Sequence, residues 1–349
     1  MPIEVMKEML TPKKLLTQIT SALVVLVLVM IVCSMIGTQR VSLKAAFGGA
    51  GGDDGVNTDY EIFVRVRLPR IMLACLVGAA LACSGVVFQG ILRNPLADPY
   101  ILGISSGAGL GAIIAVVSGF GWTFWGRSPI AIFAFVGALG TVWLVWSIGR
   151  LTGKSHVTGL LLAGVVVNAF FSSVIMFLTS VAKSDQVFST IFWLMGNMTE
   201  EDFAVLWVGA GCVLAGILAL FYISPQLNAI SFGDEDARTM GISTGRIQTA
   251  AFAIAAAITA IAVSLSGLIG FVGLIVPHGI RLVFGPDHRQ LLPLSAITGS
   301  IFLIIADAIA RIIVAPAQLP VGVITAIVGG PFFLVMLVKY ARRVGWLIR

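Results

Sequence analysis

The sequence predicts an all-α polytopic membrane protein with about ten transmembrane helices, and three observations support this fold class. The mean hydropathy is +1.03, and 58% of the 349 residues are hydrophobic while 11% are charged, which is far more apolar than a soluble domain. Apolar runs of about 20 residues recur along the chain, and each can cross the hydrocarbon as a helix. The runs are continuous rather than alternating, which excludes a β-barrel.

The apolar runs predict ten spans, and the whole chain, 1–349, is expected to form a single transmembrane domain. In order the spans are 14–37, 66–90, 99–118, 128–149, 157–181, 203–223, 246–266, 268–285, 291–311 and 320–340. The first run follows Lys7, Lys13 and Lys14. It is too long for a signal peptide and has no small-residue cleavage site, so we expect a retained first helix.

Proline and glycine mark the junctions and contacts of these spans. Pro225 ends span six, and the stretch RNPLADP (93–99) predicts a tight structural turn before span three. Gly103, Gly107 and Gly111 fall at four-residue spacing, hence on one helix face. Small residues at this spacing let two helix backbones approach closely in lipid, so we expect tight packing there.

The distribution of positive charge predicts the orientation. With ten spans both termini lie on one side, and that side carries fourteen of the 22 Lys and Arg residues while the other carries eight. This excess predicts that both termini are cytoplasmic. The net charge of +6 is therefore explained by topology, and nucleic acid is not an expected partner.

A dense polar segment, SFGDEDARTMGIS (231–243), interrupts the apolar chain between spans six and seven. It belongs to the longest cytoplasmic connection, 224–245. Good helix formers from Asp234 to Met240, followed by Gly241, predict a short helix at the membrane surface. Such a helix is either a solvated loop element or a docking surface for a cytoplasmic partner.

The sequence offers no catalytic constellation. The stretch IGRLTGKS has three residues between Gly149 and Gly153, whereas a phosphate-binding loop needs four and follows a strand. The histidines, His156, His278 and His288, have no second ligand at metal-binding spacing. We therefore predict no metal site and no enzyme activity in this chain. The four cysteines are interpreted as small apolar packing residues.

Asp307 and Arg311 lie four residues apart within span nine, where an ionisable residue is a functional hypothesis. At this spacing the two charges can neutralise one another on one helix face. A proton relay would require further buried carboxylates, and Asp307 is the one found in mid-span. An ion-coupled secondary transporter is thus a weakly supported alternative, and a membrane enzyme is another.

Seven segments together resemble one transporter family. They are RVRLPR (65–70), GAALACSGVVFQGILRNPLADPYILGISSGAG (78–109), LLLAGVVVN (160–168), FGDEDARTMGIS (232–243), GFVGLIVPHGIRLVFGPDHRQLLP (270–293), ADAIAR (306–311) and LPVGVITAIVGGPFF (319–333). From about residue 60 to 340 the chain is similar to the permease subunits of bacterial type II ABC importers for iron chelates (siderophores), haem and vitamin B12.

The resemblance implies the partners and the location. Two permease chains form a homodimer, or occasionally a close heterodimer, in the bacterial cytoplasmic (inner) membrane, with the translocation path along the dimer axis. Two cytoplasmic ATPase subunits bind ATP and Mg, so this chain needs no cofactor of its own. A substrate-binding protein delivers the metal-chelate cargo from outside. A ferric siderophore is the favoured cargo, and haem and cobalamin remain open.

The resemblance also implies roles for particular residues. Coupling to the ATPase is expected from the loop 224–245, at Gly233, Asp234, Glu235, Asp236, Arg238 and Gly241. Docking of the binding protein is expected at Arg67, Arg70 and Arg311, and Arg311 could pair either with that protein or with Asp307. The gate and pore candidates are Ser155, His156, Val157, Thr158 and Asn168.

Overall fold

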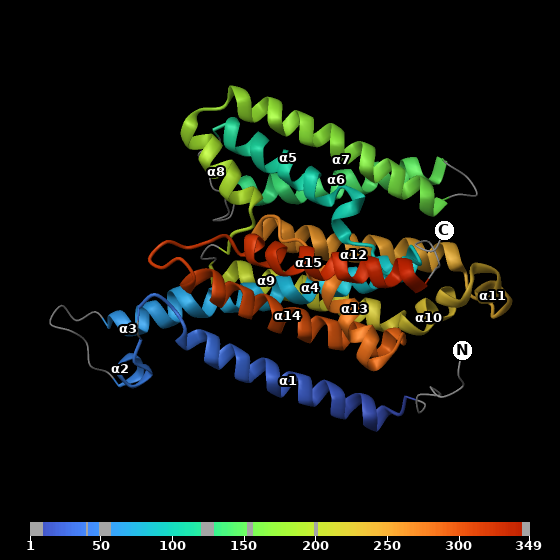
Figure 1. Cartoon of the computed structure of the whole chain (residues 1–349), viewed down its shortest axis with the longest axis horizontal. Coiled ribbons are helices and arrows are strands. Elements are labelled where there is room, and N and C mark those ends of the chain that lie inside the picture. Colours follow the sequence, from blue (N-terminus) through green and yellow to red (C-terminus); the bar gives the residue numbers. More distant parts are fainter. Residues whose placement is uncertain are drawn as a thin grey trace.

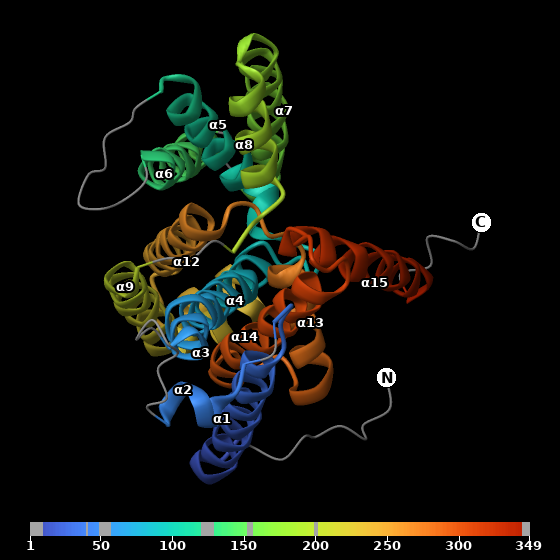
Figure 2. The same cartoon turned by 90° about the vertical axis from the view of Figure 1, so that its left-hand side faces the viewer.

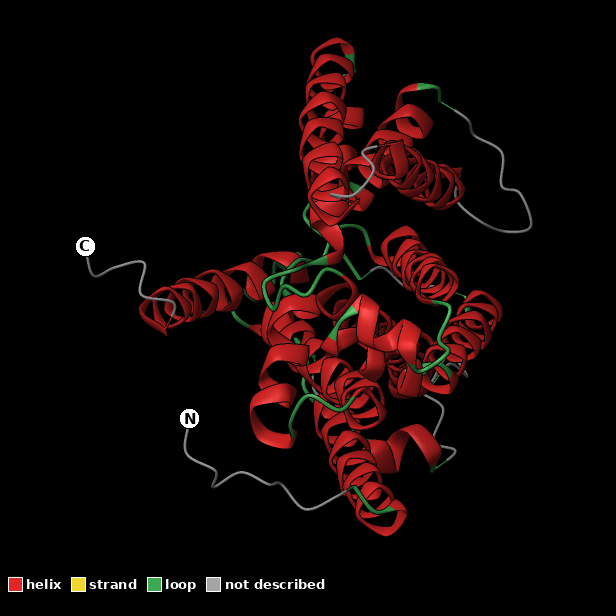
Figure 3. Cartoon of the chain, turned by 90° about the vertical axis from the view of Figure 1, so that its right-hand side faces the viewer, coloured by secondary structure: helices red, strands yellow, loops and turns green. Residues whose placement is uncertain are grey.

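The computed structural model describes residues 10–39, 41–48, 57–119, 129–151, 156–198 and 202–343. Within these ranges the chain folds into helices joined by loops and turns, and contains no strand (Figure 3). This confirms the predicted all-α class.

Ten helices correspond to the ten predicted spans. They are α1 (Pro12–Met35), α4 (Leu68–Ile91), α5 (Ile104–Val117), α6 (Pro129–Leu151), α7 (His156–Val181), α9 (Phe203–Tyr222), α12 (Thr244–Ser266), α13 (Val272–Phe284), α14 (His288–Ile312) and α15 (Val321–Arg343). Among the described residues, eight helices are long and apolar enough to cross a membrane, and α5 and α13 are shorter apolar helices. The number of spans therefore agrees with the prediction.

Further helices lie at the two ends of the bundle. At one end are α10 (Ser224–Phe232) and α11 (Asp234–Thr239), together with the first turn of α1 and the last turn of α15 (Figure 1). We call this the α11 end. The opposite end, which we call the α8 end, carries α2 (Leu43–Phe47), α3 (Thr58–Tyr60) and α8 (Ser184–Leu194) (Figure 1). A π-helical segment, η1 (Glu61–Arg67), continues α3 into α4.

Helix α4 forms the centre of the bundle, with 83% of its most apolar window buried, whereas the corresponding window of α1 is 6% buried. Helices α9, α12, α13 and α14 surround α4, and α1 packs on the outside of α14 (Figure 2). Helices α5, α6, α7 and α8 form a second group beside α12 (Figure 2). Both helices are apolar all round, for different reasons: α1 faces lipid over most of its surface, whereas α4 is surrounded by other helices.

The predicted close packing of α5 occurs against α6. A Cβ atom added at Gly107 would lie 2.5 Å from the carbonyl oxygen of Gly137, and one at Gly111 would overlap the carbonyl oxygen of Phe133. The two backbones therefore touch, which any larger residue would prevent. Gly103 has a different role, because its φ of 78° ends the 3₁₀ segment η2 (Pro99–Leu102) before α5 begins.

Two of the predicted spans, 99–118 and 268–285, are interrupted rather than continuous. The first begins as η2, and residues 267–271 of the second are non-helical, so that α13 starts only at Val272. The hydroxyl of Tyr100 in η2 accepts a hydrogen bond of 2.8 Å from the backbone N–H of Ile269. Irregular backbone at membrane depth is stable only where protein satisfies it, and here the two interrupted spans contribute to satisfying each other.

Candidate functional site

The polar segment at the α11 end forms a helix, as its residues predict. The first turn of α11 contains three acidic residues, Asp234, Glu235 and Asp236. Their negative charges interact favourably with the positive end of the helix dipole. Gly241 has a φ of 79°, and the N–H of Ile242 donates to the carbonyl of Ala237 at 3.0 Å. This left-handed glycine closes the helix.

Asp234 is bound within the chain. Its Oδ1 accepts from Nη2 of Arg93 at 2.5 Å and from Nε2 of Gln248 at 3.1 Å, so it joins the α4–η2 turn to α12. Arg93 also donates to the carbonyl of Ile230 in α10 at 3.1 Å. Asp234 is one of the residues predicted to couple to an ATPase, and these contacts give it a structural role within the chain as well.

The remaining charged positions of α11 face outward. Glu235, Asp236 and Arg238 are exposed, and beside them Phe232 and Met240 are 81% and 66% exposed. The α11 end thus presents acidic, basic and large apolar side chains on one short element. This combination fits a protein contact better than a solvated loop.

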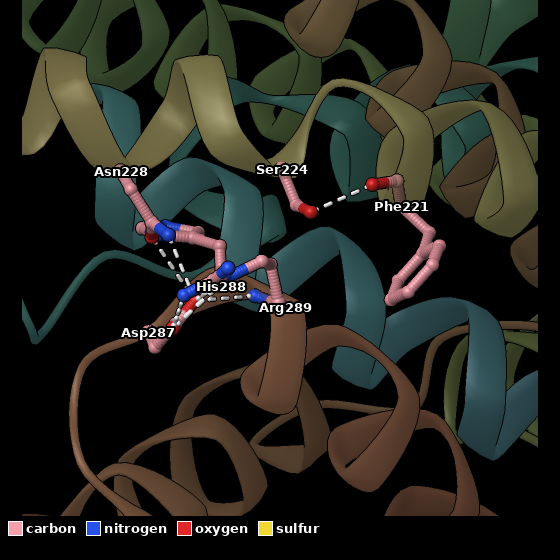
Figure 4. A network of polar contacts seen from close by, with 6 residues as sticks. All are labelled: Phe221, Ser224, Asn228, Asp287, His288 and Arg289. Atoms are coloured by element: carbon pink, nitrogen blue, oxygen red, sulfur yellow. Dashed lines mark hydrogen bonds and ion pairs between the residues drawn. The ribbon is translucent and has the colours of Figure 1, made fainter. Parts of the chain in front are cut away.

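A polar network joins α10 to the turn between α13 and α14 (Figure 4). Nδ2 of Asn228 donates to Asp287 at 2.7 Å, and Oδ1 of Asn228 accepts from the backbone N–H of His288 at 2.8 Å. Arg289 binds Asp287 through Nε at 3.1 Å and Nη2 at 2.7 Å. Burial alone would raise the pKa of Asp287, but the hydrogen bonds from Arg289 and Asn228 outweigh it and lower that pKa.

Three arginines and one aspartate form a buried cluster toward the α8 end. Nη2 of Arg70 lies 2.9 Å from Oδ1 of Asp307, and Nε of Arg311 lies 3.1 Å from Oδ2. Arg70 also donates to Oε1 of Gln318 at 2.7 Å. Asp307 is 1% exposed, and Arg67, Arg70 and Arg311 are likewise buried. Arg311 therefore pairs with Asp307, as their spacing allows.

Two of these arginines, Arg67 and Arg311, cap the last turn of α1, which has no basic residue of its own. Nη1 of Arg67 donates to the carbonyl of Ser34 at 2.8 Å, and Nη2 of Arg311 donates to that of Cys33 at 3.2 Å. Arg311 reaches Ile36 as well, at 3.0 Å. The carbonyls at a helix C-terminus lack intrahelical partners, and cations stabilise that end of the dipole.

A cavity of about 180 Å³ adjoins this cluster, lined by Arg67, Arg70 and Arg311 together with Gln39 and Gln318. Three guanidinium groups and one carboxylate give the cluster an excess of two positive charges. The structure thus brings the three predicted docking arginines together, with most of their hydrogen bonds made inside the chain. The cavity is the part that an external anionic group could reach.

The gate and pore candidates are only partly described. Ser155 lies outside the described residues, as do the side chains of His156 and Val157, although their backbone begins α7. Thr158 and Asn168 are exposed on α7.

Large apolar residues of α7 and α15 are exposed as well. Phe170, Met176 and Phe177 are all exposed, as are Ile327 and Leu334 of α15.

Asn228 and Asp98 were not singled out by sequence reasoning. Asn228 lies in the predicted cytoplasmic loop, and its contacts depend on residues about 60 positions away. Asp98 is buried in the RNPLADP turn and accepts from the N–H of Tyr100 at 2.8 Å. Burial raises its pKa to about 6, against which the Tyr100 hydrogen bond acts. The proline after Asp98 was a visible sign of a capped turn.

Comparison with known proteins identifies relatives over nearly the whole chain. A family model described as the FecCD transport family matches residues 24–339. The cobalamin import system permease protein BtuC of Halobacterium salinarum is 43% identical over 81% of this chain and 75% of its own length. The hemin transport system permease protein HmuU of Yersinia pestis is 35% identical over 92% of this chain and 95% of its own.

A solved structure shares the fold. It is an inward-facing conformation described as a metal-chelate type ABC transporter, with a TM-score of 0.80 and 30% identity, covering 93% of this chain and 99% of that one. PsaBC from Streptococcus pneumoniae, at 17% identity and a TM-score of 0.52, shares the fold alone.

Proposed function

Because the chain belongs to the FecCD transport family and is a permease subunit of an ABC importer, we propose that it conducts a metal chelate into the cell across the bacterial cytoplasmic membrane. The observation that carries this proposal is the family match over residues 24–339. A ferric siderophore is the favoured cargo. Haem and cobalamin are the other candidates, because a hemin permease and a cobalamin permease are similar to most of the chain. Both termini are proposed to be cytoplasmic.

ATP hydrolysis is proposed to occur on two partner subunits that bind ATP and Mg, with no catalytic site in this chain. The α11 end is the proposed contact. Its exposed Glu235 and Arg238 offer charge-assisted hydrogen bonds, and Phe232 offers an apolar anchor. Because Asp234 and Asn228 connect this element to the α4–η2 turn, α12 and α14, a movement of the partner would be transmitted directly to the spans.

The binding protein is proposed to dock at the α8 end, over the cavity lined by Arg67, Arg70 and Arg311. The excess positive charge of this cluster favours acidic side chains on the partner and would orient their approach. Arg70 and Arg311 pair with Asp307, and Arg67 and Arg311 cap α1. Docking would therefore act on side chains that also hold helices of the bundle together.

A second copy of the permease is proposed to cover the exposed apolar residues of α7 and α15 and to form the translocation path with them. Phe170, Met176 and Leu334 represent this surface. Asn168 and Thr158 lie on the exposed side of α7 and are proposed to line the path. The gate is proposed at the start of α7, at Ser155, His156, Val157 and Thr158.

Reconstitution tests the transport proposal. The permease, its ATPase and its binding protein would be assembled in vesicles and offered ferric siderophores, haem and cobalamin. Uptake of one chelate that requires all three proteins and MgATP on the ATPase side is expected. Uptake by the permease alone, driven by a proton or sodium gradient, would instead establish the ion-coupled carrier.

Charge reversal tests the coupling surface. Glu235→Arg should lower chelate transported per ATP hydrolysed at least severalfold, because it places a positive charge in the proposed contact. Asp185→Arg is the matched control, since Asp185 is an exposed acidic residue in the first turn of α8 and does not line the proposed docking cavity. Unchanged transport per ATP in the Glu235 variant would refute the assignment of α11.

A further inference from the structure

Helix α13 contains a proline, Pro277, that interrupts its internal hydrogen bonding. Proline has no N–H, so the carbonyl oxygen of Gly273, four residues earlier, receives no donor from the helix itself. Gly273 is buried, and a buried carbonyl without a partner is costly. A proline at such a position also lets a helix bend. The integrity of α13 at this point therefore depends on a donor from another part of the chain.

Gln89 of α4 supplies that donor. Its Nε2 lies 3.3 Å from the carbonyl oxygens of both Gly273 and Leu274. Its Oε1 accepts a hydrogen bond of 2.9 Å from Nη1 of Arg281, which follows Pro277 by four residues. Gln89 is 3% exposed. One buried side chain thus binds α13 on both sides of the proline, and we call Gln89 and Arg281 the Pro277 clamp.

Arg281 determines which way the amide of Gln89 points. A guanidinium group can only donate hydrogen bonds, so it selects the amide oxygen of Gln89 and leaves the amide nitrogen facing the two carbonyls. Each polar atom of the Gln89 amide therefore has a partner of the correct kind in α13.

The two ends of α13 are attached to different parts of the bundle. At its start, a Cβ atom added at Gly85 of α4 would overlap the carbonyl oxygen of Gly273, so the backbones of the two helices touch. At its end, α13 leads into the turn at Asp287 and His288, which Asn228 of α10 binds. Helix α13 thus connects the central helix α4 to the α11 end.

Helix α13 also contacts α15, which carries part of the surface proposed to line the translocation path. The ring centroids of His278 and Phe332 lie 6.4 Å apart in an edge-to-face arrangement. His278 directly follows Pro277, so this contact and Arg281 lie on the same side of the proline. A displacement of the α13–α14 turn would therefore reach α15 through the segment that the Pro277 clamp holds.

We propose that Gln89 is a positioning residue for energy coupling. By joining the two parts of α13 across Pro277, it makes a displacement of the α11 end move α15 instead of bending α13. Arg281 assists by orienting the Gln89 amide. The inference rests on the proposed function, because it assumes that a partner ATPase displaces the α11 end.

A suppressor experiment tests the coupling role in vesicles that hold the permease, its ATPase and its binding protein. Gln89→Met keeps the side-chain length but removes the donor to both carbonyls, and should lower chelate transported per ATP hydrolysed severalfold. The double variant Gln89→Met/Pro277→Ala should recover most of this loss, because the substituted residue 277 has an N–H for the Gly273 carbonyl. Ser84→Ala is the matched control, since its buried hydroxyl also lies on α4 but binds the carbonyl of Ala255 in α12.

Hydrogen exchange of the permease alone in detergent measures the Pro277 clamp without transport. Gln89→Met should accelerate exchange at the amides of residues 278–284 about fivefold, which corresponds to the loss of about 1 kcal/mol, the typical net contribution of one hydrogen bond. Adding Pro277→Ala should reverse this acceleration. Ser84→Ala should leave the exchange of these amides unchanged.

The two measurements separate the possible failures. Unchanged exchange in Gln89→Met, or acceleration that Pro277→Ala does not reverse, would refute the Pro277 clamp. Accelerated exchange with unchanged transport per ATP would show that Gln89 holds α13 without acting in coupling, and would overturn the positioning role. Absence of ATP-driven import by the wild type would overturn the proposed function and with it the coupling role, whereas the clamp itself is decided by the exchange measurement.

Discussion

Arg70 and Asp307 lie 237 positions apart in the sequence, and Nε and Nη2 of Arg70 both lie 2.9 Å from Oδ1 of Asp307. Arg311 approaches the other carboxylate oxygen at 3.1 Å. One buried carboxylate is therefore shared by two guanidinium groups from different helices. Removing a charge from a buried pair leaves its partner uncompensated, which costs more than the pair itself contributes.

Asp307→Asn should destabilise the protein by about 3 kcal/mol or more, because Arg70 and Arg311 would remain buried without their counter-ion. The melting midpoint of the detergent-solubilised chain would measure the effect. Glu61→Gln removes a more exposed pair, with side-chain exposures of 73% for Arg65 and 39% for Glu61, and should cost less than about 1 kcal/mol. Similar midpoints for the two variants would contradict the assigned role of Asp307.

Asn228→Ala should loosen the junction between α10 and α14. It removes the donor to Asp287 and the acceptor of the His288 N–H, at a cost of about 1–3 kcal/mol for partly buried groups left unsatisfied. Hydrogen exchange is expected to accelerate at the amides of residues 288–291. Ser231→Ala on the same helix is the control, because its hydroxyl bonds only to the carbonyl of Leu227 in α10. Unchanged exchange in the Asn228 variant would show that the network does not hold the turn.

Gly107→Ala should push α5 away from α6, because its Cβ would lie 2.5 Å from the carbonyl oxygen of Gly137 and would overlap the Thr141 hydroxyl. Overpacking of this kind costs about 1–3 kcal/mol. Gly140→Ala, on the exposed side of α6, meets no atom within 4 Å and should leave the melting midpoint nearly unchanged. If both substitutions were tolerated equally, the backbone contact between the helices would be wrong.

Asp98 should make stability depend on pH between about 4 and 6. Burial raises its pKa from 3.8 to about 6 in the folded protein, so the folded state holds a proton that the unfolded state releases. Stability from this residue is therefore complete below pH 4 and is lost as the pH rises through 6, by at most about 3 kcal/mol. Asp98→Asn keeps an oxygen for the Tyr100 N–H and should remove this dependence, which melting midpoints at pH 4 to 8 would measure. Parallel curves for the two proteins would refute it.

Hydropathy predicted the number of spans because a segment that crosses lipid must form its backbone hydrogen bonds within itself, as an apolar helix of about 20 residues. It could not predict that spans three and eight are interrupted. Pro99, Gly103 and Gly267 were visible signs, but the Tyr100–Ile269 hydrogen bond that makes the interruption stable joins residues 169 positions apart. Helix α8 was missed for another reason: its eleven residues are too few to span, so a search for apolar runs passed over it.

The α11 helix was predictable because its signals are local: acidic residues at the start and a glycine after the end. The arginine cluster was only half predictable. The resemblance identified Arg67, Arg70 and Arg311, and the i,i+4 spacing suggested the Arg311–Asp307 pair. Nothing in the local sequence indicated that Arg67 and Arg311 also cap α1, since the acceptors are backbone carbonyls, which every residue carries.

The capping of α1 by Arg311 bears on how the protein is made. The carbonyl of Ile36 receives its guanidinium donor from a residue 275 positions later, so a ribosome must translate nearly the whole message before that end of the first helix is complete. Until then the nascent chain must leave those carbonyls to water or headgroups. Truncated chains that stop short of α14 should therefore insert into the membrane yet remain prone to proteolysis near residue 36.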